Sequence, residues 1–260
     1  MPDYYEYYTL KPINYQIQAF ETLCYHSIMK HLDFNQRILV GITSKDDFHW
    51  PKQMAEVAKF KITEVSLFLE KLPYSQRKKV YQSLLKSKIK SIPLVHLRHD
   101  MSKEEIEFLV KNYQVKFLTI HEINFNYLKQ WQGYYSSLFL EMNADDRLSP
   151  KVEVEKIGGF CVDLSHFKKA EVKFSREFAY ILKRKDSSLF FRCNHLNGYS
   201  PVENADLHTI ISLKDFDYLT TLPKFLFSNV IALEVENSIA DQLKFKKYLA
   251  EMLNNYFQND

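Results

Sequence analysis

Histidine, aspartate and glutamate residues recur in this chain where short apolar segments end. Imidazole and carboxylate groups together form the ligand set that zinc, manganese or iron prefers in proteins. Asp163 and His166 lie three residues apart at one such end, and Asp206 and His208 lie two apart in an extended stretch, so each pair can face one centre. The complete set of candidate metal ligands is His96, His121, Glu141, Asp163, His166, His195, Asp206, His208 and Glu234.

These nine ligands are more than a single metal ion can use, because one ion binds about four to six. Carboxylates that bridge neighbouring ions would allow the set to hold two ions or three. Closely spaced divalent ions stabilise both the attacking and the leaving oxygen of a phosphoryl displacement, and they generate hydroxide at neutral pH. The number and types of ligand therefore favour hydrolysis of a phosphate ester.

Two ligand positions stay open at the level of sequence. Either His96 or His99 could be the ligand at the end of the third strand, and Arg98 between them could contact a phosphate or be an ion-paired surface residue. The pair Glu236–Asn237 could replace Glu234 if the register of the last strand differs by two residues. Each alternative leaves the predicted chemistry unchanged.

The elements that must position these side chains alternate between short apolar runs and amphipathic helical patterns. Eight runs are almost continuously apolar, as strands covered on both faces tend to be. They are Ile38–Thr43, Thr63–Leu69, Ile92–Leu97, Lys116–His121, Leu138–Met142, Phe160–Leu164, Leu189–Cys193 and Val230–Val235. Eight strands alternating with helices predict an α/β fold, a (β/α)8 TIM barrel, whose carboxyl strand ends open onto one catalytic face. An open doubly wound sheet is the alternative.

The helical patterns include one explicit start signal. Ser102 and Glu105 have the spacing of a capping box, which opens a helix that runs to about Gln114. Further helices are expected over Tyr74–Ser87, Val172–Lys185 and Ile239–Leu253. We expect residues 38–260 to form a single barrel domain.

Residues 1–37 are expected to form an N-terminal extension of the barrel. It contains an amphipathic helical pattern over Ile13–Leu32. This extra N-terminal helix could cover the amino-terminal end of the barrel or pack on a partner subunit, and the first arrangement is favoured.

The composition excludes several classes of protein. A chain of 260 residues that is 46% hydrophobic and 26% charged is ordinary for a globular protein, and its length suits one TIM barrel. The chain has no CxxC pair, GxGxxG fingerprint or Walker loop, so neither a zinc ribbon nor a nucleotide-binding loop is indicated. Because the chain shows no signal peptide and no apolar run of about 18 residues, we expect a cytoplasmic protein without a membrane span.

Short motifs surround the candidate ligands in a definite order. They are Ser66–Leu69, Leu140-Glu141-Met-Asn143, Gly159-Phe-Cys-Val-Asp163-Leu-Ser-His166, His195-Leu-Asn197, Asp206-Leu-His208 and Leu233-Glu234. Over residues 38–253 they resemble the xylose isomerase-like barrel superfamily, and within it the endonuclease IV family of zinc-dependent apurinic/apyrimidinic endonucleases. The segment from Gly159 to His166 is similar to that family's strand-six pattern of glycine, apolar, cysteine, apolar, aspartate, x, x, histidine.

The resemblance implies a trinuclear zinc centre held by the nine candidate ligands. It implies that Glu141 bridges two ions and is a candidate base for the attacking hydroxide. The implied reaction is hydrolysis of a phosphodiester on the 5′ side of an abasic nucleotide. Arg98 and Asn143 are the residues expected to contact the phosphate-containing substrate, which would be DNA or a sugar phosphate. Leu207 stands where the family has arginine and Gly198 where it has aspartate, and these differences affect the expected substrate more than the ligands.

Two other functions remain open at the level of sequence. A sugar or sugar-phosphate isomerase or epimerase of the same superfamily would need chiefly Glu141, Asp163, His195 and Glu234 around one Mn2+ or Mg2+ ion. Its catalytic residues Glu141 and Glu234 would then shuttle a proton on either face of a ketose carbon. A barrel that binds a ligand without catalysis is the third possibility. The number of bound metal ions per chain separates the three.

Overall fold

The computed structural model describes residues 33–43, 49–187 and 190–258. Residues 1–32, and with them the helix expected over Ile13–Leu32, lie outside the described residues. The principal sheet contains nine strands, and every neighbouring pair in it is parallel. The strands are β1 (Ile38–Leu39), β2 (Gly41–Ile42), β3 (Ser66–Phe68), β4 (Leu94–His96), β5 (Phe117–His121), β6 (Leu138–Glu141), β7 (Phe160–Asp163), β8 (Phe191–Leu196) and β11 (Ile231–Leu233).

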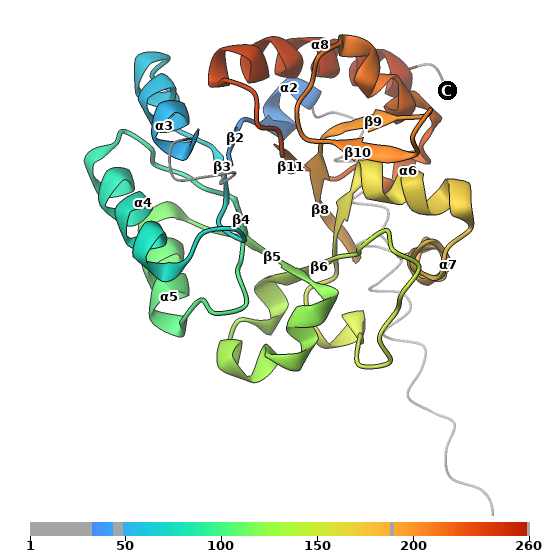
Figure 1. The fold of residues 1–260 in the computed structure, drawn as a ribbon, viewed down its shortest axis with the longest axis horizontal. Helices are drawn as coiled ribbons and strands as arrows, with labels where there is room; N and C mark the ends of the chain where they lie inside the picture. Colours follow the sequence, from blue (N-terminus) through green and yellow to red (C-terminus); the bar gives the residue numbers. More distant parts are fainter. Residues whose placement is uncertain (1–32, 44–48, 188–189, 259–260) are drawn as a thin grey trace, which may run out of the picture.

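The sheet curls until its two ends nearly meet (Figure 1). Its strand order is β1-β11-β8-β7-β6-β5-β4-β3-β2, so β1 and β2 lie at opposite ends of the order. Val40 alone separates these two strands along the chain. The same short segment therefore pairs with β11 on one side and with β3 on the other, which confirms the predicted α/β fold of the TIM-barrel type.

A glycine is required where the sheet comes together. A Cβ atom at Gly41 would collide with the carbonyl oxygen of Leu233 in β11. The backbone of Gly41 is also held by Gln242, whose Oε1 accepts from the Gly41 N–H at 2.7 Å and whose Nε2 donates to the Gly41 carbonyl at 3.0 Å. This close approach of two backbones ties the first strand to the last helix.

Helices surround the sheet in chain order (Figure 1). They are α2 (Phe34–Arg37), α3 (His49–Lys59), α4 (Tyr74–Lys86), α5 (Lys103–Tyr113), α6 (Leu164–Lys173), α7 (Arg176–Leu182) and α8 (Ile239–Gln258). The Ser102–Glu105 capping box is present at the start of α5. Among the helices of the described residues, none combines the length and hydropathy that a transmembrane span needs.

The helix predicted over Val172–Lys185 is wrong in its bounds. The side chain of Asp163 accepts a hydrogen bond from the backbone N–H of His166, so α6 begins directly after β7. Phe174 then adopts the left-handed conformation with φ 50°, and Ser175 caps a second helix, α7. The structure therefore has two short helices in this region, and the first of them begins earlier than the single helix that the sequence predicts.

Not every connection between neighbouring strands contains an α-helix. The chain from β5 to β6 forms the 3-10 segments η1 (Glu122–Asn126), η2 (Leu128–Trp131) and η3 (Tyr135–Ser137), and the chain from β6 to β7 forms η4 (Val154–Lys156). Between β8 and β11 lie the antiparallel strands β9 (Gly198–Ser200) and β10 (Ala205–Leu207), followed by η6 (Leu213–Thr221) and η7 (Lys224–Leu226). In the connection from β5 to β6, Trp131 packs into the core. Its side chain is fully buried, and its Nε1 donates to the Met101 carbonyl at 2.9 Å.

Candidate metal centre

The barrel interior contains an apolar layer from six strands. This floor consists of Phe68, Leu94, Phe139, Cys161, Cys193 and Ala232. Residues two apart in an extended strand point to the same side of the sheet. The residue two places after each floor residue therefore faces the same interior, one level nearer the carboxyl strand ends. These residues are Glu70, His96, Glu141, Asp163, His195 and Glu234.

Five of these six residues, all except Glu70, form three overlapping groups of ligand atoms together with His121 at the end of β5. Within each group, one ligand atom from every residue lies within 4.8 Å of the others. The first group is Glu141, Asp163, His195 and Glu234, the second is His96, His121 and Glu141, and the third is His96, His195 and Glu234. We call the six residues of these groups the inner cluster. Glu141 is the residue that the first and second groups share, so its carboxylate lies between two potential ion positions.

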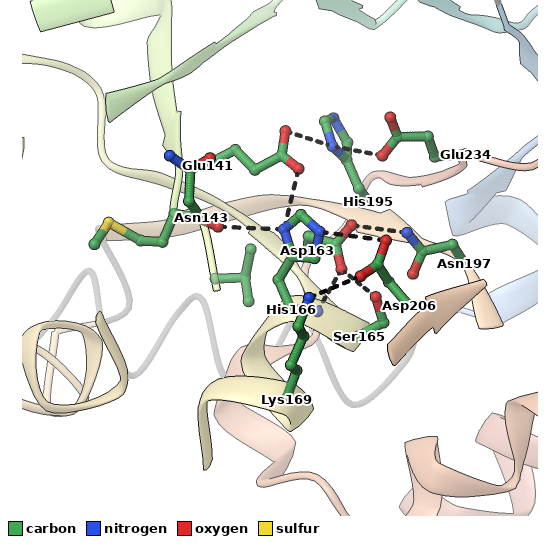
Figure 2. Close-up of polar contacts among 12 residues, drawn as sticks. Glu141, Asn143, Asp163, Ser165, His166, Lys169, His195, Asn197, Asp206 and Glu234 are labelled. Atoms are coloured by element: carbon green, nitrogen blue, oxygen red, sulfur yellow. Dashed lines mark hydrogen bonds and ion pairs between the residues drawn. The ribbon is translucent and has the colours of Figure 1, made fainter. Parts of the chain in front are cut away.

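The polar atoms at the centre of the inner cluster are buried but make no hydrogen bonds. Nδ1 of His195 lies 3.0 Å from Oε2 of Glu141 and 3.2 Å from Oε2 of Glu234, yet none of these three atoms has a hydrogen-bond partner (Figure 2). Both ring nitrogens of the buried His96 and Nδ1 of His121 are also unpartnered. An unsatisfied buried polar group costs about 1–3 kcal/mol, and native proteins leave few of them. A cation coordinated by these atoms would satisfy them, so the inner cluster could hold a metal ion.

Asp163 is held in a fixed orientation by its neighbours (Figure 2). Its Oδ1 accepts hydrogen bonds from Ser165 Oγ at 2.9 Å and from the backbone N–H of His166 at 2.8 Å. Its Oδ2 accepts from Asn197 Nδ2 at 3.0 Å. Because the N-terminus of α6 and the end of β8 both hold this carboxylate, it is preorganised as a ligand.

The remaining predicted ligands form a separate set beside the inner cluster. We call His166, Asp206 and His208 the outer trio. Oδ2 of Asp206 lies 3.3 Å from Nε2 of His208 and 3.9 Å from Nε2 of His166. His166 connects the two sets, because its Nδ1 lies 3.6 Å from Oε1 of Glu141 (Figure 2). Lys169 also reaches the outer trio, with its Nζ 3.2 Å from Oδ1 of Asp206.

Protonation differs among the histidines of the site. Burial opposes protonation of His195, yet Cys161 and the carboxylates of Glu141 and Glu234 raise its pKa well above the usual value. Burial lowers the pKa of His96 to about 3, so its imidazole is neutral, which is the form that binds a metal ion. Burial opposes the charged form of Glu141, but His195 and His121 hold its pKa well below the usual value. Burial also opposes protonation of His166, yet the Asp163 carboxylate and the contact with Asp206 raise its pKa to about 10.

His208 titrates in the same direction as His166. Burial opposes its protonation, but the contact with Asp206 raises its pKa to about 9. The pKa of Asp206 is in turn held far below its usual value, chiefly by its contacts with His166 and His208. Without bound metal, the outer trio is therefore a carboxylate between two protonated imidazoles.

Sequence reasoning missed Glu70 as a member of the site. Its Oε2 is buried without a hydrogen-bond partner and lies 3.6 Å from Nδ1 of His96. Burial and the nearby Glu234 carboxylate raise the pKa of Glu70 to about 7. The signal was present in the sequence, because Glu70 directly follows the apolar run Thr63–Leu69 and lies two places after a floor residue.

The structure places the alternative ligands as follows. His96 belongs to the inner cluster, whereas His99 is exposed and its ring lies 5.9 Å from that of Tyr127. Glu234 belongs to the inner cluster, whereas the side chain of Asn237 binds the backbone N–H and carbonyl of Ile210. Glu236 accepts a hydrogen bond from a threonine hydroxyl at 3.0 Å.

The two residues expected to contact substrate lie outside the inner cluster. Nε of Arg98 lies 3.6 Å from Oδ1 of Asp100 in the loop after β4. Asn143 follows β6, and its backbone N–H donates to Oε1 of Glu122 at 3.0 Å. The resemblance to endonuclease IV stays a prediction, because no protein-family model matches this chain and no curated protein matches it.

Proposed function

We propose that this chain is a divalent-metal-dependent hydrolase of a phosphate ester. The observation that carries the proposal is the sharing of Glu141 by two groups of ligand atoms in the inner cluster. A carboxylate that belongs to two groups of ligand atoms could bridge a pair of ions, one in each group. A pair of ions is the arrangement that stabilises both oxygens of an in-line phosphoryl displacement.

The donor set indicates which ions would fit. The inner cluster offers imidazoles from His96, His121 and His195, together with three carboxylates. This mixture suits zinc or manganese better than calcium, which prefers oxygen ligands alone. When bound, such ions act as Lewis acids toward the phosphate and lower the pKa of a water molecule toward neutrality.

The side chains of the inner cluster have distinct proposed roles. Asp163, His195 and Glu234 would hold one ion, and His96 with His121 would hold the other. Glu141 would contribute to both positions, and its fully buried carboxylate lies on the apolar floor, which keeps water away from one side. The phosphate-containing substrate, DNA or a sugar phosphate, would enter from the carboxyl strand ends, where Arg98 and Asn143 are proposed to contact it.

A sugar or sugar-phosphate isomerase is the second candidate, and one observation favours it. The group of Glu141, Asp163, His195 and Glu234 is complete by itself as a four-ligand site for one ion. In that case the two glutamates, which both lie against Nδ1 of His195, would exchange a proton with the substrate carbon. His96 and His121 would then have no role as ligands.

Metal content distinguishes the two candidates. Protein purified without added metal is analysed by inductively coupled plasma mass spectrometry and then assayed on an abasic-site duplex, on bis(p-nitrophenyl) phosphate and on ketose phosphates. We expect at least two zinc or manganese ions per chain and hydrolysis of a phosphate ester. One ion with ketose conversion would favour the isomerase. A folded chain with no bound metal and no metal-dependent thermal shift would rule out both enzymes. The third function, a barrel that binds a ligand without catalysis, would then be the one that remains.

A further inference from the structure

The outer trio differs from the inner cluster in how its polar atoms are satisfied. Nδ1 of His166 lies 3.3 Å from the Met142 carbonyl oxygen, and Nδ1 of His208 lies 3.1 Å from the Glu234 carbonyl oxygen. These contacts turn Nε2 of both histidines toward Asp206. Among the residues that the structure describes, the buried atoms without hydrogen-bond partners include atoms of the inner cluster and none of the outer trio.

Lys169 places an ammonium group beside the outer trio. It lies in α6 one turn after His166, so both side chains share one face of the helix. Its Nζ contacts Oδ1 of Asp206 at 3.2 Å (Figure 2), while Oδ2 of the same carboxylate lies 3.9 Å from Nε2 of His166 and 3.3 Å from Nε2 of His208. An ion bound by Asp206 and the histidines would share this carboxylate with an ammonium group, and the two positive charges would repel each other.

Among the residues described, the inner cluster has no lysine or arginine beside it. Within the described part of the chain, its ion pairs join histidines to carboxylates, and no lysine or arginine pairs with one of its members. The three groups of ligand atoms close enough to hold an ion also include no residue of the outer trio. The two sets therefore differ in three respects: the spacing of their ligand atoms, the hydrogen bonding of their polar atoms and the presence of a neighbouring lysine.

We infer that Lys169 supplies the positive charge that a third ion would otherwise supply, so the centre binds two ions and the outer trio binds none. This inference rests on the proposed function, because it presupposes that ions occupy the inner cluster. It departs from the three-ion centre that the sequence resemblance implies. It also assigns Lys169, which lies outside every motif on which the resemblance rests, as the residue that decides the number of ions.

The test removes the ammonium charge and counts zinc. The full chain and its variants are equilibrated with excess zinc, separated from free metal by gel filtration and analysed for zinc per chain. We expect two ions in the wild type and three in Lys169→Met, because the outer trio then presents Asp206 and two imidazoles, which release their protons when metal binds, without a competing ammonium group. Lys169→Arg keeps the charge and should bind two.

Two further variants make the readout specific. Lys168→Met removes a neighbouring lysine of the same helix, whose Nζ pairs with Oε2 of Glu171 at 2.7 Å, and it should still bind two ions. The double variant Lys169→Met with Asp206→Asn should return from three ions to two, which shows that the gained ion uses the outer trio. Lys169 is partly exposed, and circular dichroism with a thermal melt checks that each variant is folded.

The outcomes separate this inference from the proposed function. Three ions in the wild type, or two ions in both the wild type and Lys169→Met, would overturn the inference and leave a metal-dependent centre intact. A folded wild type that binds no ion would overturn the proposed function and the inference with it. A gain of one ion in Lys168→Met as well would assign the effect to general surface charge and refute the role of Lys169.

Discussion

Replacing Glu141 by glutamine tests whether one carboxylate serves two ion positions. The change keeps the shape of the side chain and removes its charge, and it leaves three ligands in the first group but only two in the second. We expect loss of the second ion and an affinity for the first that is about 100-fold lower. With zinc at about 1,000 times Kd, two occupied sites stabilise the wild type by about 8 kcal/mol, whereas a single weakened site stabilises the variant by about 1.4 kcal/mol.

The assay is a thermal melt with zinc and with a chelator, together with zinc per chain. At about 2–4 °C per kcal/mol for a chain of this size, the zinc-dependent shift in Tm should fall by about 13–26 °C in Glu141→Gln. His121→Ala provides the internal comparison, because His121 belongs only to the second group and the variant should keep about half of the wild-type shift. Glu171→Gln makes the same chemical change on the surface of α6 and should behave as the wild type.

Two results would refute the reasoning about Glu141. A Glu141→Gln variant with an unchanged zinc-dependent shift would show that its carboxylate is not a ligand. Equal losses in Glu141→Gln and His121→Ala would show a single ion held by the whole inner cluster. The melting temperature in chelator serves as the control for damage to the fold itself.

Three further predictions concern pH, orientation of the ligands and closure of the barrel. The raised pKa values of His166 and His208, about 10 and about 9, mean that their stabilising charge is fully present below about pH 6.5 and is lost as pH rises through 9 to 10. Urea unfolding of the chelated protein should therefore show decreasing stability over that alkaline range, and His208→Gln should flatten the decrease; a stability that rises there contradicts the assignment. Asn197→Ala removes the hydrogen bond that orients the Asp163 carboxylate, so competition with a chelating dye should show a zinc affinity about 10–100-fold lower. An unchanged zinc affinity would count against this orienting role of Asn197. Gly41→Ala should lower the free energy of unfolding by at least about 1–3 kcal/mol, because the new Cβ collides with a backbone carbonyl of β11, and a neutral effect in urea titration would mean that the sheet does not come together there.

The sequence predicted the parts of the site that depend on local pattern. Short, almost continuously apolar runs identify strands, and an acidic residue at the end of such a run marks its carboxyl end. Glu141 and Asp163 lie at the ends of their runs, and Glu70 directly follows the run Thr63–Leu69, so the same pattern also points to Glu70. The capping box at Ser102 is equally local, because its hydrogen bonds join residues only three positions apart.

Long-range packing decided what the local patterns could not. Trp131 ends the 3-10 segment η2, where its side chain is fully buried and its Nε1 donates to the carbonyl of Met101, thirty residues earlier in the sequence. The ambiguity between His96 and His99 was settled in the same way, since only the curvature of the sheet brings His96 beside His121 and Glu141. Such contacts leave no periodic signal in either partner.

By itself, therefore, the sequence indicated the types of the candidate ligands, the strands that carry them and the barrel that brings strand ends to one face. Only the tertiary structure divided the nine candidate ligands into the inner cluster and the outer trio, and only it placed Lys169 beside Asp206, thirty-seven residues further along the chain. The physical reason is range. Strand and helix formation depends on neighbours within a few residues. Coordination and charge repulsion depend on distances of a few ångströms between groups that only the curled sheet and the strands β9 and β10 bring together.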